Sequence, residues 1–86
     1  MKPEKVFRIG SSLASVFLKE IKTDSGEKKI RQVKLQRSFR DGDEWKYTSY
    51  FSLAEMAQAM AVLKIAMDYV ASQEAEITES GITESQ

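Results

Sequence analysis

The feature that most constrains this chain is a helix start at Ser52, which divides the sequence into a strand-forming part and a helical part. The segment Ser52-Leu53-Ala54-Glu55 fits the capping box, in which the Ser52 hydroxyl and the Glu55 carboxylate each accept a hydrogen bond from the other's backbone N–H. Phe51 and Met56 stand at the positions of a hydrophobic staple. Apolar residues then recur at spacings of four and three, at Met56, Met60, Leu63, Met67 and Val70. This repeat predicts one helix that ends near Gln73 or Glu74.

The sequence before Ser52 is typical of strands separated by turns. Strand-forming runs cover residues 6–9, 13–23, 30–39 and 45–51, and they are rich in β-branched and aromatic side chains. Turn compositions stand between them, at Gly10-Ser11-Ser12, Asp24-Ser25-Gly26-Glu27 and Asp41-Gly42-Asp43-Glu44. In the third run apolar residues alternate with polar ones, which predicts a strand with one buried face and one solvated face.

These elements predict an α+β fold, a four-stranded antiparallel meander followed by one long C-terminal helix, in the order β-β-β-β-α. A single domain over residues 1–74 is expected, because 86 residues are too few for two cores. Residues 75–86 contain no basic side chain and carry two copies of Ile-Thr-Glu-Ser, so we expect a disordered acidic tail there.

The chain contains no His and no Cys, and this excludes several classes of chemistry. Imidazole bases, thiolate nucleophiles, disulfides and ordinary zinc sites are all ruled out. The carboxylates fall in turns, at the helix cap and in the tail, with no convergent pair. We therefore expect a protein that is not an enzyme and binds no metal or cofactor. The charged start and the absence of a long uncharged apolar run favour the cytoplasm and no contact with a membrane.

The predicted helix carries more apolar surface than one sheet contact needs. The repeat from Met56 to Val70 suffices to cover a sheet, yet a second strip lies beside it, made of Val62, Ile65 and Tyr69. This strip is either the margin of a broad core face or the interface of a homodimer. The small size of the domain favours the dimer, because a short chain buries too little surface to be stable alone.

The formal net charge of zero hides an uneven distribution. Of the 13 basic residues, residues 1–50 hold 12, against 7 of the 13 acids, whereas residues 51–86 hold only Lys64 against 6 acids. A basic sheet with aromatic side chains is suited to single-stranded nucleic acid, because Lys and Arg neutralise phosphates and aromatic rings stack on bases. A plain solvated strand face explains each basic residue equally well when it is taken singly.

The predicted nucleic-acid-binding residues lie on the third and fourth runs. If Phe51 faces the helix, then Trp45, Tyr47 and Ser49 face inward, and Lys46, Thr48 and Tyr50 face outward beside the third strand. Trp45 remains a candidate because its ring can be reached from the rim. The predicted binding residues are Lys34, Gln36, Arg37, Arg40, Trp45, Lys46 and Tyr50.

Over about residues 5–73 the pattern resembles the positive-cofactor-four type transcriptional coactivators and, more loosely, the Whirly and Pur proteins. The matching pieces are Phe7-Arg8-Ile9-Gly10 and Lys46 leading into Tyr50-Phe51-Ser52-Leu53-Ala54-Glu55. Residues 40–49 are also similar to a stretch in small uncharacterised bacterial proteins. The resemblance implies single-stranded DNA or RNA bound on a sheet, with helices holding a dimer. The coactivators' Lys-rich glycine segment is replaced here by Trp45-Lys46-Tyr47-Thr48-Ser49-Tyr50.

The predicted function is binding of single-stranded nucleic acid, DNA ahead of RNA, by a homodimer in the bacterial cytoplasm. The alternative is a small protein-interaction or inhibitory module, of the phage or mobile-element type, that uses its helix surface or a sheet edge. The acidic tail either recruits a protein partner or serves only to keep the chain soluble.

Overall fold

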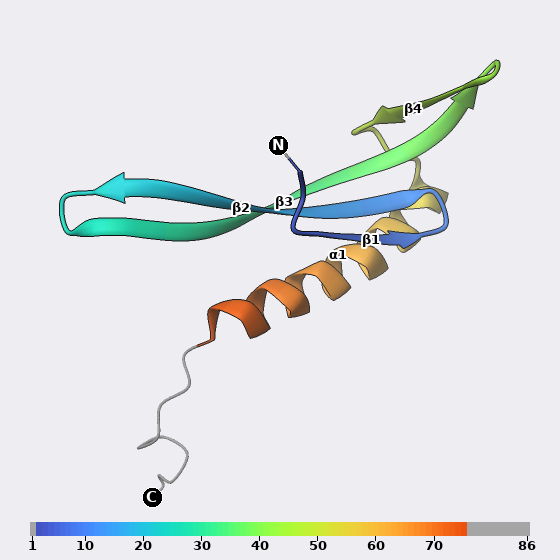
Figure 1. Cartoon of the computed structure of the whole chain (residues 1–86). Helices are drawn as coiled ribbons and strands as arrows, with labels where there is room; N and C mark the ends of the chain where they lie inside the picture. Colours follow the sequence, from blue (N-terminus) through green and yellow to red (C-terminus); the bar gives the residue numbers. More distant parts are fainter. Residues whose placement is uncertain (1, 76–86) are drawn as a thin grey trace, which may run out of the picture.

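The computed structural model describes residues 2–75 and consists of one antiparallel sheet and one helix (Figure 1). The strands are β1 (Lys5–Ile9), β2 (Ser12–Thr23), β3 (Gly26–Asp41) and β4 (Glu44–Thr48), and the helix is α1 (Leu53–Glu74). The strands lie in the order β1-β2-β3-β4, so each one pairs with its neighbour in sequence. The predicted α+β meander with a C-terminal helix is confirmed. The predicted tail lies outside the described residues, apart from Ala75.

Two-residue turns fix the register of the two later hairpins. Thr23 pairs with Gly26 across Asp24-Ser25, and Asp41 pairs with Glu44 across Gly42-Asp43. Gly42 has a φ of +66°, a left-handed conformation that side chains with a Cβ rarely adopt. Because each turn has a defined length, every opposite pair along β2–β3 and β3–β4 follows from it.

The two central strands are much longer than the edge strands. β1 pairs only with residues 12–16 of β2, and β4 only with residues 37–41 of β3. The rest of β2 and β3 forms a two-stranded ribbon that projects beyond the helix (Figure 1). The described chain is therefore elongated, with extents of 57 × 31 × 17 Å.

The core is small and lies between α1 and the first two strands. Ala14 and Val16 of β2 are buried against Val62 and Ala66 of α1. Phe7, Ile9, Leu35, Tyr69 and Val70 pack around this centre. The Phe7 and Tyr69 rings meet edge to face, with centroids 5.7 Å apart. Since the central side chains are short, the helix axis comes close to the sheet.

The turn between β1 and β2 also lies against the helix. Gly10 has a φ of +60°, and a Cβ added there would stand 2.5 Å from the side chain of Gln58 on α1. The left-handed backbone conformation therefore favours glycine at this position, while the Gln58 amide is the end of a flexible side chain that could move aside.

The helix presents a different side to the sheet from the one that its spacing predicts. Met56, Met60, Leu63 and Met67 were expected to form the core, yet Met60 and Met67 are 71% and 58% exposed. Val62, expected at a dimer interface, is fully buried in the core, so that prediction is wrong. Tyr69 is half-buried beside Phe7, and Ile65 is exposed. The reason is steric: β2 offers short side chains, and the Ala-containing side of α1 fits them best.

The predicted capping box is present at the start of α1. The backbone N–H of Glu55 donates to the Ser52 hydroxyl at 3.3 Å, and that of Ser52 donates to the Glu55 carboxylate at 2.9 Å. Arg37 of β3 pairs with the same carboxylate at 3.1 Å. The helix start is therefore fastened to the sheet. None of the helices among residues 2–75 is long and apolar enough to cross a membrane.

We predict that enlarging a side chain at the centre of the core destabilises the fold. Ala66 is fully buried among Ala14, Val16 and Val62, so Ala66→Leu should lower the free energy of unfolding by about 1–3 kcal/mol. Ala61 is exposed on the same helix, and Ala61→Leu should change it by less than about 0.5 kcal/mol. Urea unfolding followed by circular dichroism measures both. Equal stability of the two variants would contradict this packing.

The lowered pKa values of two carboxylates, Glu4 and Glu55, lead us to predict that the fold loses stability in acid. Hydrogen bonds from Arg31 lower the pKa of Glu4, and hydrogen bonds from the Ser52 backbone and hydroxyl lower the pKa of Glu55. A carboxyl with a lower pKa in the folded state stabilises the fold above its usual value of 4.5, and this contribution is lost as the pH falls through the lowered pKa. We expect the Tm to fall below pH 4.5. The double variant Glu4→Gln, Glu55→Gln should have a lower Tm at pH 7 and a shallower fall in acid. An unchanged slope in that variant would refute the assignment.

Candidate nucleic-acid interface

One side of the sheet carries no helix, and we call it the open face. Alternation along each strand defines it, because Ala14 and Val16 point to α1 and their sequence neighbours point away. The strand residues of the open face are Val6, Arg8, Leu13, Ser15, Phe17, Lys19, Ile21, Lys28, Ile30, Gln32, Lys34, Gln36, Ser38, Arg40, Trp45 and Tyr47.

The acidic residues of the strands all lie on one face, whereas basic residues lie on both. The open face holds Arg8, Lys19, Lys28, Lys34 and Arg40 and no acid, whereas the acidic strand residues, Glu20, Glu27, Asp41 and Glu44, all lie on the helix side. None of the five ion pairs within residues 2–75 involves a base of the open face. The pairs are Lys29–Glu20, Arg31–Glu4, Arg37–Glu55, Lys46–Asp41 and Lys64–Asp68. The basic side chains of the open face are therefore available to an external anion.

The β3–β4 register places two aromatic rings on the open face. Trp45 stands opposite Arg40, and Tyr47 stands opposite Ser38. The expectation that Trp45 and Tyr47 face inward is therefore wrong. It assumed that the strand continues to Phe51, but β4 ends at Thr48, whose hydroxyl accepts a hydrogen bond from the backbone N–H of Tyr50 at 3.2 Å. The bend breaks the alternation, so the orientation of Phe51 says nothing about Trp45.

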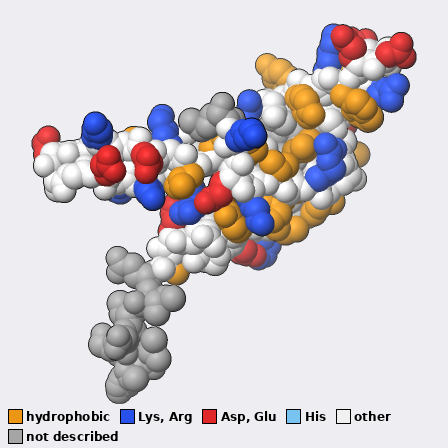
Figure 2. Space-filling view, viewed as in Figure 1, with side chains coloured by type: hydrophobic (Ala, Val, Ile, Leu, Met, Phe, Trp, Pro, Cys, Tyr) orange, Lys and Arg blue, Asp and Glu red, His pale blue; other side chains and the backbone are white. Residues whose placement is uncertain are grey.

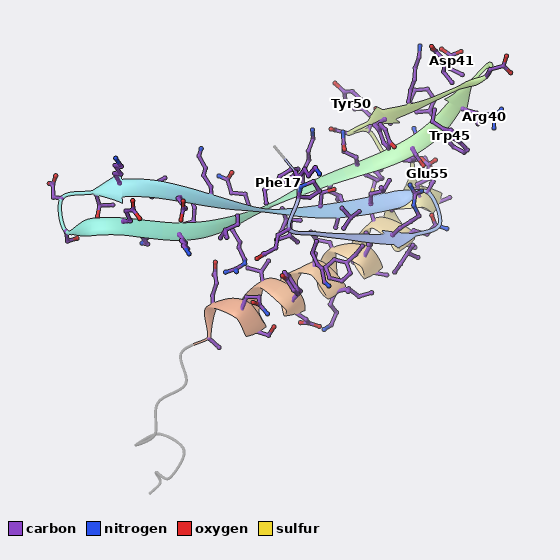
Figure 3. All side chains as sticks on the ribbon, in the orientation of Figure 1. Phe17, Arg40, Asp41, Trp45, Tyr50 and Glu55 are labelled. Atoms are coloured by element: carbon purple, nitrogen blue, oxygen red, sulfur yellow. The ribbon has the colours of Figure 1, made fainter. Side chains whose placement is uncertain are left out.

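These rings are accessible. Trp45 and Tyr47 are 59% and 54% exposed. The Arg40 guanidinium lies 5.2 Å from the centre of the Trp45 ring, a cation–π contact that holds the ring at the β3–β4 end of the sheet (Figure 3). Phe17 lies on the same face farther along β2 and is half-buried (Figure 3). Hydrophobic and basic side chains gather around β4 and the adjoining sheet in Figure 2.

A hollow of about 280 Å³ opens on this face between Arg8, Ser38, Trp45 and Tyr47. Arg8 reaches over from β1, and its Nη1 lies 3.3 Å from the Ser38 hydroxyl and 3.5 Å from the Gly10 carbonyl oxygen. The Ser38 hydroxyl in turn donates to the carbonyl oxygen of Ser11 at 3.4 Å. The hollow thus has aromatic side chains from β4 and a positioned guanidinium.

Four of the predicted binding residues share the open face: Lys34, Gln36, Arg40 and Trp45. Arg37 and Lys46 lie on the helix side. Arg37 pairs with Glu55, and its Nε donates to the Tyr50 carbonyl oxygen at 3.2 Å, while Lys46 is 2.8 Å from Asp41. Tyr50 lies beyond the end of β4 and is exposed beside Phe51 and Met56. The structure does not bring these three together with the others.

Sequence reasoning missed Arg8, Phe17 and Tyr47 as members of this surface. A signal for Tyr47 was available, because a two-residue turn at Gly42-Asp43 pairs Asp41 with Glu44 and hence Ser38 with Tyr47. No comparable signal existed for Phe17, since both faces of β2 carry apolar residues.

A second surface, which we call the methionine groove, lies on the helix side. One hollow of about 370 Å³ is lined by Leu35, Tyr50, Phe51, Met56, Met60 and Leu63, among others. An adjoining hollow of about 430 Å³ is lined by Val33, Leu63, Met67 and Val70, with Ala71 and Glu74 at its end. The groove exists because α1 lies over β1 and β2 and leaves part of β3 uncovered.

Comparisons of the chain with protein-family models, curated proteins and solved structures find no match. The chemistry of the open face and of the methionine groove is therefore what bears on function.

Proposed function

We propose that the protein binds single-stranded nucleic acid on the open face as a homodimer, with DNA ahead of RNA as the ligand and the cytoplasm as the compartment. The observation that carries the proposal is that the strand residues of the open face include bases and no acid. All five open-face charges are basic, at Arg8, Lys19, Lys28, Lys34 and Arg40, and exposed Trp45 and Tyr47 lie among them.

Each part of this surface has a role in such binding. Lys34 and Arg40 neutralise phosphates and release counterions, which makes the affinity depend on salt. Trp45 and Tyr47 stack on bases, and this requires bases that are not already stacked in a duplex. Gln32 and Gln36 add hydrogen-bonding groups between the charges. A single strand therefore fits the face better than a double helix does.

The proposed homodimer uses the methionine groove. Met56, Met60, Leu63 and Met67 follow one another at spacings of four, three and four, which is the repeat of a helix–helix seam. These side chains are exposed in the single chain, whose own core is small. A second copy placed about a two-fold axis would cover the seam with an identical seam. The open face is on the other side of the sheet and stays free.

We predict salt-dependent binding of a labelled oligothymidylate, measured by fluorescence anisotropy. Lys34→Ala should weaken binding and reduce the slope of log K against log salt by about one. Trp45→Ala should reduce the binding free energy by about 1–3 kcal/mol. Lys46→Ala removes the same charge from the helix side, beside Asp41, and should have a clearly smaller effect. If the oligothymidylate does not bind at about 50 mM salt, or if its affinity does not depend on salt, the proposed nucleic-acid binding is wrong.

We predict a dimer in light scattering that Leu63→Glu converts to a monomer. Leu63 lines both hollows of the methionine groove, so a carboxylate there would be desolvated in the interface. Ala61 is exposed outside the groove and the core, and Ala61→Glu should leave the dimer intact. If light scattering shows that the unmodified protein is a monomer, the proposed dimer is wrong. That result would favour the alternative function, in which the same groove binds a different protein.

A further inference from the structure

The hollow between β1, β3 and β4 offers more than charge, because its polar groups are fixed in place. Ser38 is buried, and its hydroxyl bridges the Arg8 guanidinium and the Ser11 carbonyl oxygen. Arg8 is held a second time, by the Gly10 carbonyl oxygen. Arg40 is also anchored, by the Gly42 carbonyl oxygen at 3.5 Å, but its guanidinium lies against the Trp45 ring. Of these two anchored arginines, Arg8 is the one that lines the hollow.

From this geometry we infer that the hollow is a recognition pocket for one unstacked guanine base. The inference rests on the proposed binding of single strands to the open face. At about 280 Å³ the hollow lies just below the range of about 300–1,000 Å³ typical of drug-sized ligands, and it suits one planar base. Trp45 and Tyr47 supply aromatic surface for stacking, and Arg40 holds the Trp45 ring.

The donor pattern selects the base. A guanidinium has five N–H donors and no acceptor, and two of its donors can meet two adjacent acceptors. Guanine presents such a pair, O6 and N7, on one edge. Adenine places an amino donor next to N7, cytosine presents an amino donor, and thymine presents a single acceptor beside a methyl group. On this edge only guanine satisfies Arg8 twice. Unpaired cytosine has a second kind of acceptor pair, N3 and O2, on its Watson–Crick edge, so a preference for cytosine over guanine would overturn the assignment.

Ser38 is a positioning residue in this pocket. Its hydroxyl donates to Ser11 and accepts from Arg8, so it directs the guanidinium without contacting the base itself. Because Arg8 is held before the ligand arrives, less side-chain freedom is lost on binding.

The test uses the only tryptophan of the chain, Trp45, as a reporter inside the pocket. The full-length protein is titrated with oligothymidylates that carry one central guanine, adenine or cytosine, and both Trp45 fluorescence and anisotropy are followed. We expect the guanine oligonucleotide to bind more tightly than the others by roughly 5- to 150-fold, the effect of one bidentate arginine–base pair. It should also change the Trp45 emission most. A central 7-deazaguanine, which lacks the N7 acceptor, should lose the preference, and hypoxanthine, which keeps O6 and N7, should retain it.

Two variants separate recognition from simple charge. Arg8→Lys keeps the charge but loses the forked pair of donors, so the guanine preference should vanish while the salt dependence with oligothymidylate remains. Ser38→Ala should weaken the preference, and Ser38→Thr, which restores the hydroxyl, should recover it. Circular dichroism confirms that each variant is folded.

The outcomes distinguish this inference from the proposed function. Equal affinity for all central bases, or a preference that survives Arg8→Lys, overturns the guanine pocket and leaves salt-dependent binding standing. Absence of salt-dependent binding to any oligonucleotide overturns both. Loss of the preference with 7-deazaguanine and with Arg8→Lys, but not with hypoxanthine, supports the pocket.

Discussion

The close packing of α1 on β2 is the contact on which the rest of the structure depends. Val62 and Ala66 meet Ala14 and Val16, and only short side chains permit that approach. This contact decides which face of every strand is covered, since residues alternate across a sheet. It also decides which side of the helix is left over, and the exposed methionines follow from it. Both candidate surfaces are thus consequences of one packing choice.

The open face shows how a neutral chain can present a basic surface. Along the sequence, the first 50 residues are basic and the remainder is acidic. In the structure the strand acids all lie on the helix side, so the bases of the open face have no acid beside them on that face, while further bases such as Arg37 and Lys46 share the helix side with the acids. The helix-side bases are partly used in ion pairs such as Arg31–Glu4 and Arg37–Glu55, which join separate segments. The two faces consequently differ in charge, because ion pairs neutralise several bases on the helix side and none of the described ion pairs involves a base of the open face.

Much of the fold was predictable because its signals are local. The capping box at Ser52 and Glu55 and the turn at Gly42 act over two to four residues, and each is present as expected. The open-face residues Lys34, Gln36 and Arg40 were also identified from the sequence. The orientation of Trp45 and Tyr47 was not, because alternation was extended through Ser49 and Tyr50, where the strand has already ended. A single irregular residue is enough to reverse every assignment beyond it.

The sequence by itself determined the elements, their order and the pairing register at the two later turns, because hydrogen bonds within a few residues set these features. It left two apolar strips on α1, one through Met60 and Leu63 and one through Val62 and Tyr69, and hydrophobicity does not rank them. Only the tertiary structure decided between them, since the choice depends on the size of the side chains that β2 presents at Ala14 and Val16. The packing of α1 on β2 also leaves Arg37 and Lys46 on the helix side of the sheet. On the opposite side, the strand pairing brings together the residues of one hollow, Arg8, Ser38, Trp45 and Tyr47. Shape complementarity across the core, which joins residues far apart in the chain, is therefore what placed the candidate site.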